Sequence, residues 1–321
     1  MIGNTQKCFL MRAIEAVDVT KKYKGSVSFA INNISLNIEP GRIFTLLGRN
    51  GAGKTTFVRI CATQLLPTSG TIKVFENDLI KDTEKIRNYI SIVPQEGRPL
   101  RALTPWDHVY YWLRIRGVNK YESFIRTKTI LQEFELYDVR NKLAMYLSGG
   151  MKQKILVAMA MATDSRILFL DEPTIGLDPV SRRQVWKAIK EKKENGTTIL
   201  LTTHYMDEAE VLSDDIVIID KGIVISQGTI ADIRKNIKEN IKIEISKSGV
   251  DSDVLKSYGT VIDGGTETLK LFTFESNIRE LSAIAIKKNL FFKVSPITLD
   301  DVFVSLVGSE PNNSDSDLSQ D

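Results

Sequence analysis

The chain has 321 residues, of which 42% are hydrophobic and 26% are charged, and its formal net charge is +3 at pH 7. This length suits one large α/β domain and a smaller one, and the composition is ordinary for a soluble globular protein. The small net charge does not by itself argue for nucleic-acid binding, and no run approaches 18 apolar residues, which excludes a membrane-spanning helix.

The first residues carry little structural signal. Only a short apolar run flanked by basic residues is present, so no signal peptide is predicted. Ordered patterning begins near Met11, an alternative start, and residues 1–11 are predicted to be an N-terminal extension. The two cysteines, Cys8 and Cys61, make no disulfide framework and fit a reducing cytosol, and Cys61 is expected to be a small buried thiol.

Two segments rich in β-branched residues, Ala13–Val17 and Val27–Ile38, predict strands before residue 40. Tyr23 lies in the turn between them. An aromatic side chain here either stacks on a nucleobase or is an ordinary strand-end tyrosine, and its position alone leaves these alternatives equal.

A glycine-rich loop follows the apolar run Ile43–Leu47. It consists of Gly48, Arg49, Asn50, Gly51, Ala52, Gly53, Lys54, Thr55 and Thr56. Its glycines let successive backbone N–H groups point at phosphate oxygens, Lys54 is placed to reach the β- and γ-phosphates, and the Thr55 hydroxyl is placed to bind Mg²⁺. A helix-like run, Phe57–Leu66, adds its positive dipole end. The loop therefore predicts binding of a nucleoside triphosphate.

Residues 70–93 are predicted to hold further short strands, the last of which ends in Tyr89–Val93. Gln95 follows this strand. A glutamine at a strand end offers a carbonyl to Mg²⁺ and an amide to an attacking water, although most glutamines are solvated surface residues.

The pattern becomes helical from about residue 98. Thr104–Asp107 is a strong helix start, and the helix is apolar on two faces, so it is either buried in the core, the more common case, or presents a groove to a partner helix. His108 is expected to be exposed on this helix, without a chemical role. The apolar side chains are Trp106, Val109, Tyr110 and Leu113 on one face, and Tyr111, Trp112 and Ile115 on the other.

Ser148, Gly149 and Gly150 directly precede a long helix that is predicted to end at Met161. Two glycines before a helix leave backbone N–H groups accessible, which suggests a second anion site. A flexible linker is the alternative, and for these residues in isolation it is the better one.

Two acids follow the buried strand Ile167–Leu170, at the edge of an α/β sheet where ligands bind. Asp171 is predicted to hold Mg²⁺ through water, and Glu172 to orient and deprotonate a water molecule. The next buried strand, Thr198–Thr202, places His204 at the same edge, where it can donate to a γ-phosphate.

The C-terminal part is predicted to be separate. A polar helix over 229–240 marks a linker, and residues 241–308 read as strand, helix, two strands, helix, strand and helix, an order that resembles a ferredoxin-like unit. The tail 309–321 is acidic and is predicted to be disordered.

In this order, the motifs over residues 12–228 resemble the ATP-binding subunit of an ABC transporter. They are Walker A (48–56), Gln95 as Q-loop, the signature (147–151), Walker B (167–172) and His204 as switch. Residues 203–210 and 297–303 are similar to the ABC-2-type exporter subgroup. The same likeness implies that Tyr23 is the adenine-stacking residue and Asp178 the D-loop residue.

The resemblance implies an α/β P-loop ABC ATPase cassette, with a RecA-like α/β core, an antiparallel β subdomain and an α-helical subdomain (about 98–160), followed by a small α+β C-terminal domain. Its implied ligands are ATP and Mg²⁺. It further implies a head-to-tail pair, formed by two copies or with a related ATPase subunit. Each ATP then lies between one Walker A and the other signature, and Lys54, Gln95, Glu172 and His204 act in hydrolysis.

The implied partner is a separate multi-span membrane permease, and no direct nucleic-acid contact is expected. The chain itself is then expected to be cytoplasmic and peripheral, on the cytoplasmic face of the cell membrane. One departure from the family is Met151, where many members have Gln, so a side-chain contact to the partner is in doubt there. Two alternatives stay open: a soluble ABC ATPase that acts on nucleic acid or ribosomes, and an ATP-gated regulatory subunit without turnover.

Overall fold

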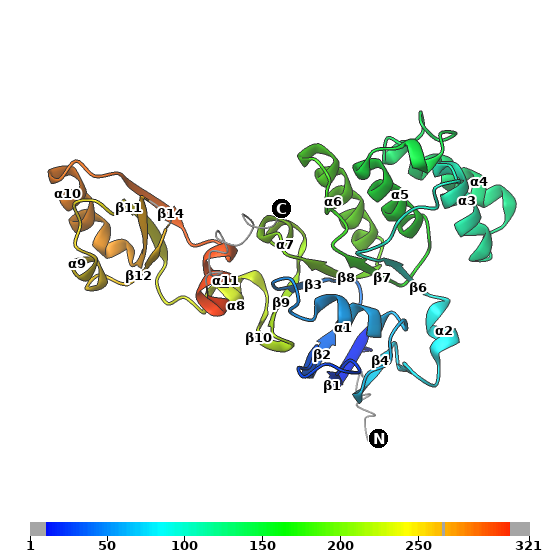
Figure 1. Ribbon diagram of the computed structural model, residues 1–321, viewed down its shortest axis with the longest axis horizontal. Coiled ribbons are helices and arrows are strands. Elements are labelled where there is room, and N and C mark those ends of the chain that lie inside the picture. Colours follow the sequence, from blue (N-terminus) through cyan, green and yellow to red (C-terminus); the bar gives the residue numbers. More distant parts are fainter. Residues whose placement is uncertain (1–10, 265–266, 309–321) are drawn as a thin grey trace, which may run out of the picture. The chain divides into compact units, whose positions relative to one another are not determined.

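The computed structural model describes residues 11–264 and 267–308, and the chain divides into two compact units, one up to Thr229 and the other from Ile230 (Figure 1). The predictions for residues 1–10 and for the tail 309–321, including Cys8, lie outside the described residues.

A six-stranded sheet forms the centre of the first unit. Its strand order is β10-β9-β3-β8-β7-β6, and all neighbours are parallel except β10 and β9. Parallel strands with both faces covered are nearly continuous apolar runs in the sequence, as β3 and β7 are apart from Thr45 and Asp171. The bounds are β3 Ile43–Leu47, β6 Ile90–Val93, β7 Ile167–Asp171, β8 Thr198–Thr203, β9 Asp215–Asp220 and β10 Ile223–Gly228.

Alternate residues of these strands enter two separate cores. Phe169 packs with helix α1 (Lys54–Cys61) and the antiparallel sheet, whereas Leu168 and Leu170 pack with α5 (Gly149–Met161) and α6 (Pro179–Glu194). Figure 1 shows these two layers on opposite faces of the sheet. Cys61 is fully buried in the first core, as the sequence predicts.

The antiparallel sheet has the order β2-β1-β4-β5. Strand β2 begins at Ile31, so the strand that was predicted from Val27 started too early. Helix α1 begins at Lys54 and ends at Cys61 rather than spanning Phe57–Leu66, and helix α2 (Thr83–Arg87) lies where only strands were predicted. The bounds are β1 Ile14–Lys21, β2 Ile31–Ile38, β4 Ser69–Val74 and β5 Asn77–Asp78.

Helix α3 (Pro105–Ile115) begins with the predicted cap. The Thr104 side chain accepts from the Asp107 N–H, and the Asp107 carboxylate accepts in return. Only one face of the helix is buried, because Tyr111 is 53% exposed and Ile115 is 78% exposed. The prediction that its second face belongs to the core is therefore wrong for Tyr111 and Ile115, whereas Trp112 on the same face is half buried. The remaining elements of this unit are α4 Lys120–Glu133, η1 Ala144–Tyr146 and α7 Met206–Leu212.

His108 is buried, which corrects the prediction that it is exposed. Its Nδ1 lies 2.7 Å from the Thr104 carbonyl oxygen, and its Nε2 accepts from the Leu100 N–H at 2.8 Å. The ring is therefore neutral, with the proton on Nδ1, and it ties α3 to the loop that precedes it. Burial lowers the pKa of His108, and the Thr104 carbonyl and Asp107 oppose this only in part.

The contribution of His108 to the stability of the first unit is expected to fall as the pH drops below about 6.5, the ordinary pKa of histidine. The pKa of His108 is lower in the folded chain, so the unfolded chain takes up the proton first. Urea unfolding followed by tryptophan fluorescence at pH 7.5 and 5.5 measures this, since Trp106 and Trp112 lie on the same helix. The His108→Asn variant should show a smaller loss between these pH values, and an equal loss would contradict the prediction.

The second unit contains a four-stranded sheet of order β12-β13-β11-β14, in which all neighbours are antiparallel. Its elements follow in the order predicted over 241–308, and this strand order is that of a ferredoxin-like unit. The polar helix α8 covers only Ile230–Arg234 of the predicted 229–240. The other bounds are β11 Ile241–Ser246, α9 Ser252–Lys256, β12 Thr260–Asp263, β13 Thr268–Thr273, η2 Glu275–Asn277, α10 Ile278–Lys287, β14 Phe292–Pro296 and α11 Leu299–Val307.

Within the described ranges, no helix is both long and apolar enough to span a bilayer.

Candidate functional site

The glycine-rich loop encloses a pocket of about 320 Å³ at the carboxyl end of β3. Gly53 has a φ of +105°, and a Cβ there would lie 2.4 Å from the carbonyl oxygen of Ala30, so only glycine fits. Ala30, which sequence reasoning missed, is thus part of the site. The lining residues are Ala30, Arg49, Asn50, Gly51, Ala52, Gly53, Lys54, Thr55, Thr56, Gln95 and Glu172.

Lys54 is 4% exposed, and its ammonium curls back over the loop. Its Nζ donates to the Gly48 carbonyl at 2.7 Å and to the Arg49 carbonyl at 3.1 Å, and it lies 3.7 Å from Glu172 Oε1. Burial lowers the pKa of Lys54, while Glu172 and Asp171 counteract that effect. An anionic ligand in this pocket meets a poorly solvated cation, which strengthens the attraction.

Three oxygen-bearing side chains from different elements meet beside Lys54. Thr55 Oγ1 lies 3.0 Å from Gln95 Oε1 and 3.2 Å from Asp171 Oδ1. Burial raises the pKa of Asp171, although hydrogen bonds from Thr202 and Thr55 oppose this. The structure therefore brings together the three residues that the sequence analysis named as metal ligands.

Glu172 and His204 form a direct pair, with His204 Nδ1 3.1 Å from Glu172 Oε2. Glu172 is 4% exposed and has a φ of +50°, a conformation that non-glycine residues rarely adopt and that clusters at functional sites. The His204 ring lies 4.1 Å from that of Tyr205.

Thr202 was missed by sequence reasoning, because a threonine within a buried strand gives no functional signal. Its Oγ1 donates to Asp171 Oδ1 at 2.5 Å and accepts from the Glu172 N–H at 3.0 Å. One hydroxyl thus fixes both acids at the end of β7.

Tyr23 lies at the rim of the pocket. It is 42% exposed, and its hydroxyl is 3.3 Å from Thr56 Oγ1. The ring is therefore close enough to the loop to stack on the base of a nucleotide whose phosphates occupy the loop.

The signature residues do not line this pocket. Ser148 caps α5 by accepting from the Met151 N–H, which uses one of the amides expected to be accessible. In the described chain, no hydrogen bond is found to the N–H groups of Gly149 and Gly150. Asp178 caps α6 through the N–H groups of residues 180 and 181, so it too lies outside the pocket.

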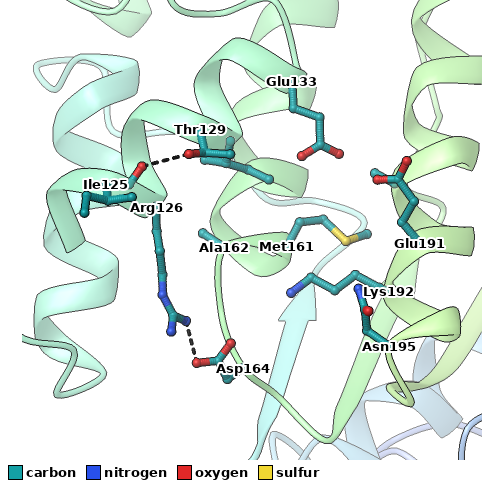
Figure 2. Close-up of a pocket in the computed structure, with 12 residues that line it drawn as sticks. Ile125, Arg126, Thr129, Glu133, Met161, Ala162, Asp164, Glu191, Lys192 and Asn195 are labelled. Carbon is teal, nitrogen blue, oxygen red and sulfur yellow. Dashed lines mark hydrogen bonds and ion pairs between the residues drawn. The ribbon is translucent and has the colours of Figure 1, made fainter. Parts of the chain in front are cut away.

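A different cleft of about 310 Å³ lies between α4, the end of α5 and α6 (Figure 2). Arg126 crosses it to Asp164 at 2.5 Å, and Lys192 donates to the Thr163 carbonyl at 2.9 Å. Burial, followed by the nearby Glu191, raises the pKa of Glu133 on its opposite wall. The cleft shares no lining residue with the phosphate-loop pocket, so we assign it no part in the chemistry described here.

Comparisons with known proteins identify the family. A sequence profile of the ABC transporter family matches residues 31–175. Over 309 residues, the chain is 33% identical to the daunorubicin/doxorubicin resistance ATP-binding protein DrrA of Streptomyces peucetius, an alignment that covers 92% of this chain and 93% of that protein. The chain belongs to the ATP-binding subunits of ABC transporters. It is thus an ATPase subunit that binds and hydrolyses ATP, as the motifs predict.

Other ABC proteins agree with this assignment. The chain is 39% identical over 204 residues to human ATP-binding cassette sub-family A member 2. This alignment covers 64% of this chain and 8% of that protein. A solved ATP-binding subunit of an ABC transporter has a TM-score of 0.65 and 28% identity, over 70% of this chain and 92% of that one. A dimeric post-hydrolysis cassette bound to ADP and Pi has a TM-score of 0.63 and 27% identity, over 67% and 98%. The predicted ABC ATPase fold is therefore confirmed.

Proposed function

We propose that this ABC ATPase subunit powers export through a separate membrane permease, by ATP-driven head-to-tail pairing with a second copy or a related ATPase subunit. The observation that carries the proposal is the division of the motifs. Lys54 and Glu172 line one pocket and His204 contacts Glu172, whereas Gly149 and Gly150 of the signature are not among the lining residues.

In the pocket and at its edge, each side chain has a distinct proposed task. Lys54 binds the β- and γ-phosphates of ATP, and Tyr23 stacks on the adenine. Glu172 accepts a proton from the attacking water, and His204 both orients that carboxylate and contacts the γ-phosphate. The 3.1 Å contact between Glu172 and His204 supports this pairing of roles.

The oxygen cluster of Thr55, Gln95 and Asp171 fits Mg²⁺, because hard oxygen donors are its preferred ligands. Bound there, Mg²⁺ would neutralise charge on the β- and γ-phosphates. A cation near Asp171 would also favour its charged form, which burial disfavours.

Pairing of two subunits is proposed to add the signature residues that the pocket of a single subunit lacks. The exposed N-terminus of α5 on one subunit completes the site of the other, so ATP joins the two chains. Asp178, which follows Walker B in the same chain, is proposed to contact the facing subunit. The dimeric form of the solved ADP- and Pi-bound cassette supports this arrangement.

The permease is proposed to dock beside Gln95 and the exposed face of α3, where Tyr111 is exposed and Trp112 is half buried. The indole Nε1 of Trp112 is buried and has no hydrogen-bond partner in the described chain. A nearby cleft of about 440 Å³ is lined by Arg98, Arg101 and Lys152 and by no acidic residue, which favours acidic side chains on the docking segment. With the permease docked there, the subunit lies on the cytoplasmic face of the cell membrane.

Replacing Tyr111 and Trp112 by Ala in the complex with the permease should lower transport at least tenfold, while ATP hydrolysis by the isolated subunit stays within twofold of wild type. The reason is that these rings are proposed to contact the partner rather than the nucleotide. Transport of a labelled substrate and phosphate release measure the two activities. The permease is identified first, as the multi-span protein that co-purifies with this chain from membranes.

Ile80→Ala is the matched control, because Ile80 is 59% exposed on a different part of the unit. Collapse of both activities together with unfolding would show that Tyr111 and Trp112 belong to the core. The soluble alternative that acts on nucleic acid or ribosomes is less well supported, since the similarity to DrrA extends over 92% of the chain and so includes most of the second unit.

A further inference from the structure

The segment of residues 172–174, here called the Glu172 segment, leaves the sheet in a strained conformation. Glu172 has a φ of +50° and is followed by Pro173. Its N–H bonds to the side chain and the carbonyl of Thr202 on β8. Conformations of this kind persist only where the surrounding structure fixes them, so the contacts of the next two residues matter for the position of the Glu172 carboxylate.

Two buried side chains from other helices hold these next residues. Gln153, on α5, donates from Nε2 to the Pro173 carbonyl at 3.0 Å. Glu208, on α7, accepts from the Thr174 hydroxyl at 2.9 Å. Neither Gln153 nor Glu208 lines the phosphate-loop pocket, so neither contacts the nucleotide there directly.

Glu208 is fully buried, and it acts as a hydrogen-bond acceptor. Its Oε1 also accepts from Trp186 Nε1 on α6 at 2.7 Å, while its Oε2 has no partner in the described chain. Burial raises the pKa of Glu208, against hydrogen bonds that favour the charged form. Since α7 begins at Met206, directly after His204 and Tyr205, Glu208 also anchors the chain that carries His204.

We propose that Gln153 and Glu208 are positioning residues that hold Glu172 and His204 in the contact needed for ATP hydrolysis. Glu208 fixes the Glu172 segment against the helix that follows His204. Gln153 fixes the same segment to α5, the helix whose N-terminus is Gly149. Any shift of α5 therefore also moves Glu172 of the same chain. A nucleotide bound by a second subunit and contacting the N-terminus of α5 could produce such a shift. The inference rests on the role proposed above for Glu172.

The test uses the full chain with Gln153→Leu, Glu208→Leu and Thr174→Val, each of which removes one side of a hydrogen bond. The kcat of ATP hydrolysis is expected to fall about tenfold to a hundredfold, because a carboxylate displaced by about 1 Å is a poor base. KM and Kd for Mg·ATP should stay within twofold, since no pocket residue changes. Thr174→Val is nearly isosteric and keeps the test valid if Glu208→Leu does not fold.

Two further variants separate positioning from other roles. Glu208→Gln retains the acceptor oxygen, so it should keep at least half of the wild-type kcat and an unchanged pH–rate profile. Gln132→Leu, at an exposed position on α4, is the control for loss of a glutamine.

If Gln153→Leu and Thr174→Val both keep the wild-type kcat while Glu172→Gln is inactive, the positioning role is overturned and the proposed function of Glu172 stands. A Glu208→Gln variant as slow as Glu208→Leu would overturn the acceptor role. A parallel loss of Tm, ATP affinity and kcat would overturn positioning in favour of a purely structural role. An active Glu172→Gln would instead overturn the proposed function of Glu172 itself.

Discussion

Replacing Glu172 by Gln is expected to lower the rate of ATP hydrolysis at least a hundredfold while leaving ATP affinity within a few fold of wild type. The amide has nearly the shape of the carboxylate but cannot accept the proton of the attacking water, and general-base catalysis contributes about 10²- to 10⁴-fold. Lys54, whose ammonium lies 3.7 Å from Glu172 Oε1, remains in place to bind phosphate. Phosphate release and nucleotide titration measure the two quantities.

The same variant should accumulate as a dimer in the presence of ATP and Mg²⁺. Hydrolysis removes the γ-phosphate interactions that favour the closed pair, so a subunit that cannot hydrolyse ATP stays closed. Size-exclusion chromatography with light scattering measures this. Glu194→Gln, at an exposed position at the end of α6, is the control and should behave like wild type. A Glu172→Gln subunit that stays monomeric at saturating Mg·ATP, even with its permease present, would contradict head-to-tail pairing.

Replacing Asp301 by Ala is expected to destabilise the second unit by about 3–5 kcal/mol, the usual cost of leaving one member of a buried ion pair alone. Asp301 is fully buried, and its carboxylate accepts from Lys242 Nζ at 2.8 and 3.0 Å. The same carboxylate completes the capping box with Thr298 that begins α11. Burial alone would raise the pKa of Asp301, but the hydrogen bonds from Lys242 and Thr298 lower it overall.

Hydrogen-exchange mass spectrometry of β11 and α11 measures the loss, because it resolves the second unit from the first. The exposed Asp300 on the same helix is the matched control, and Asp300→Ala should cost much less. Joint replacement of Lys242 by Met and Asp301 by Leu should recover part of the stability, since it removes both members of the closer pair. Lys270, whose Nζ lies 3.7 Å from Asp301 Oδ1, then loses that partner. Equal exchange in the Asp301→Ala and Asp300→Ala variants would show that the pair does not stabilise the unit.

The features that could be predicted from the sequence are those formed by residues close together in the chain. The phosphate loop, the acids after β7 and the cap of α3 depend on residues that are neighbours in the chain, so their spacing is visible in the sequence. The order of elements in the second unit is visible for the same reason, because strand and helix periodicities differ. The family likeness rests on these same local motifs.

Element limits were less well determined by the sequence. The helix after the phosphate loop was predicted three residues too late, because Lys54, Thr55 and Thr56 have no apolar periodicity, yet the loop geometry starts the helix at once. His108 was predicted to be exposed, because its burial depends on the return of the loop at Leu100 onto α3.

Only the tertiary structure decided which distant side chains meet. Thr55, Gln95 and Asp171 lie up to 116 positions apart, and the sheet order β3-β8-β7-β6 brings them together. Thr202 and Glu208 acquire their contacts in the same way, through a buried strand and a buried helix face that look like ordinary core in the sequence. The physical reason is that a hydrogen bond forms only when its donor and acceptor lie about 3 Å apart in space. The number of residues between two side chains in the sequence does not determine that distance.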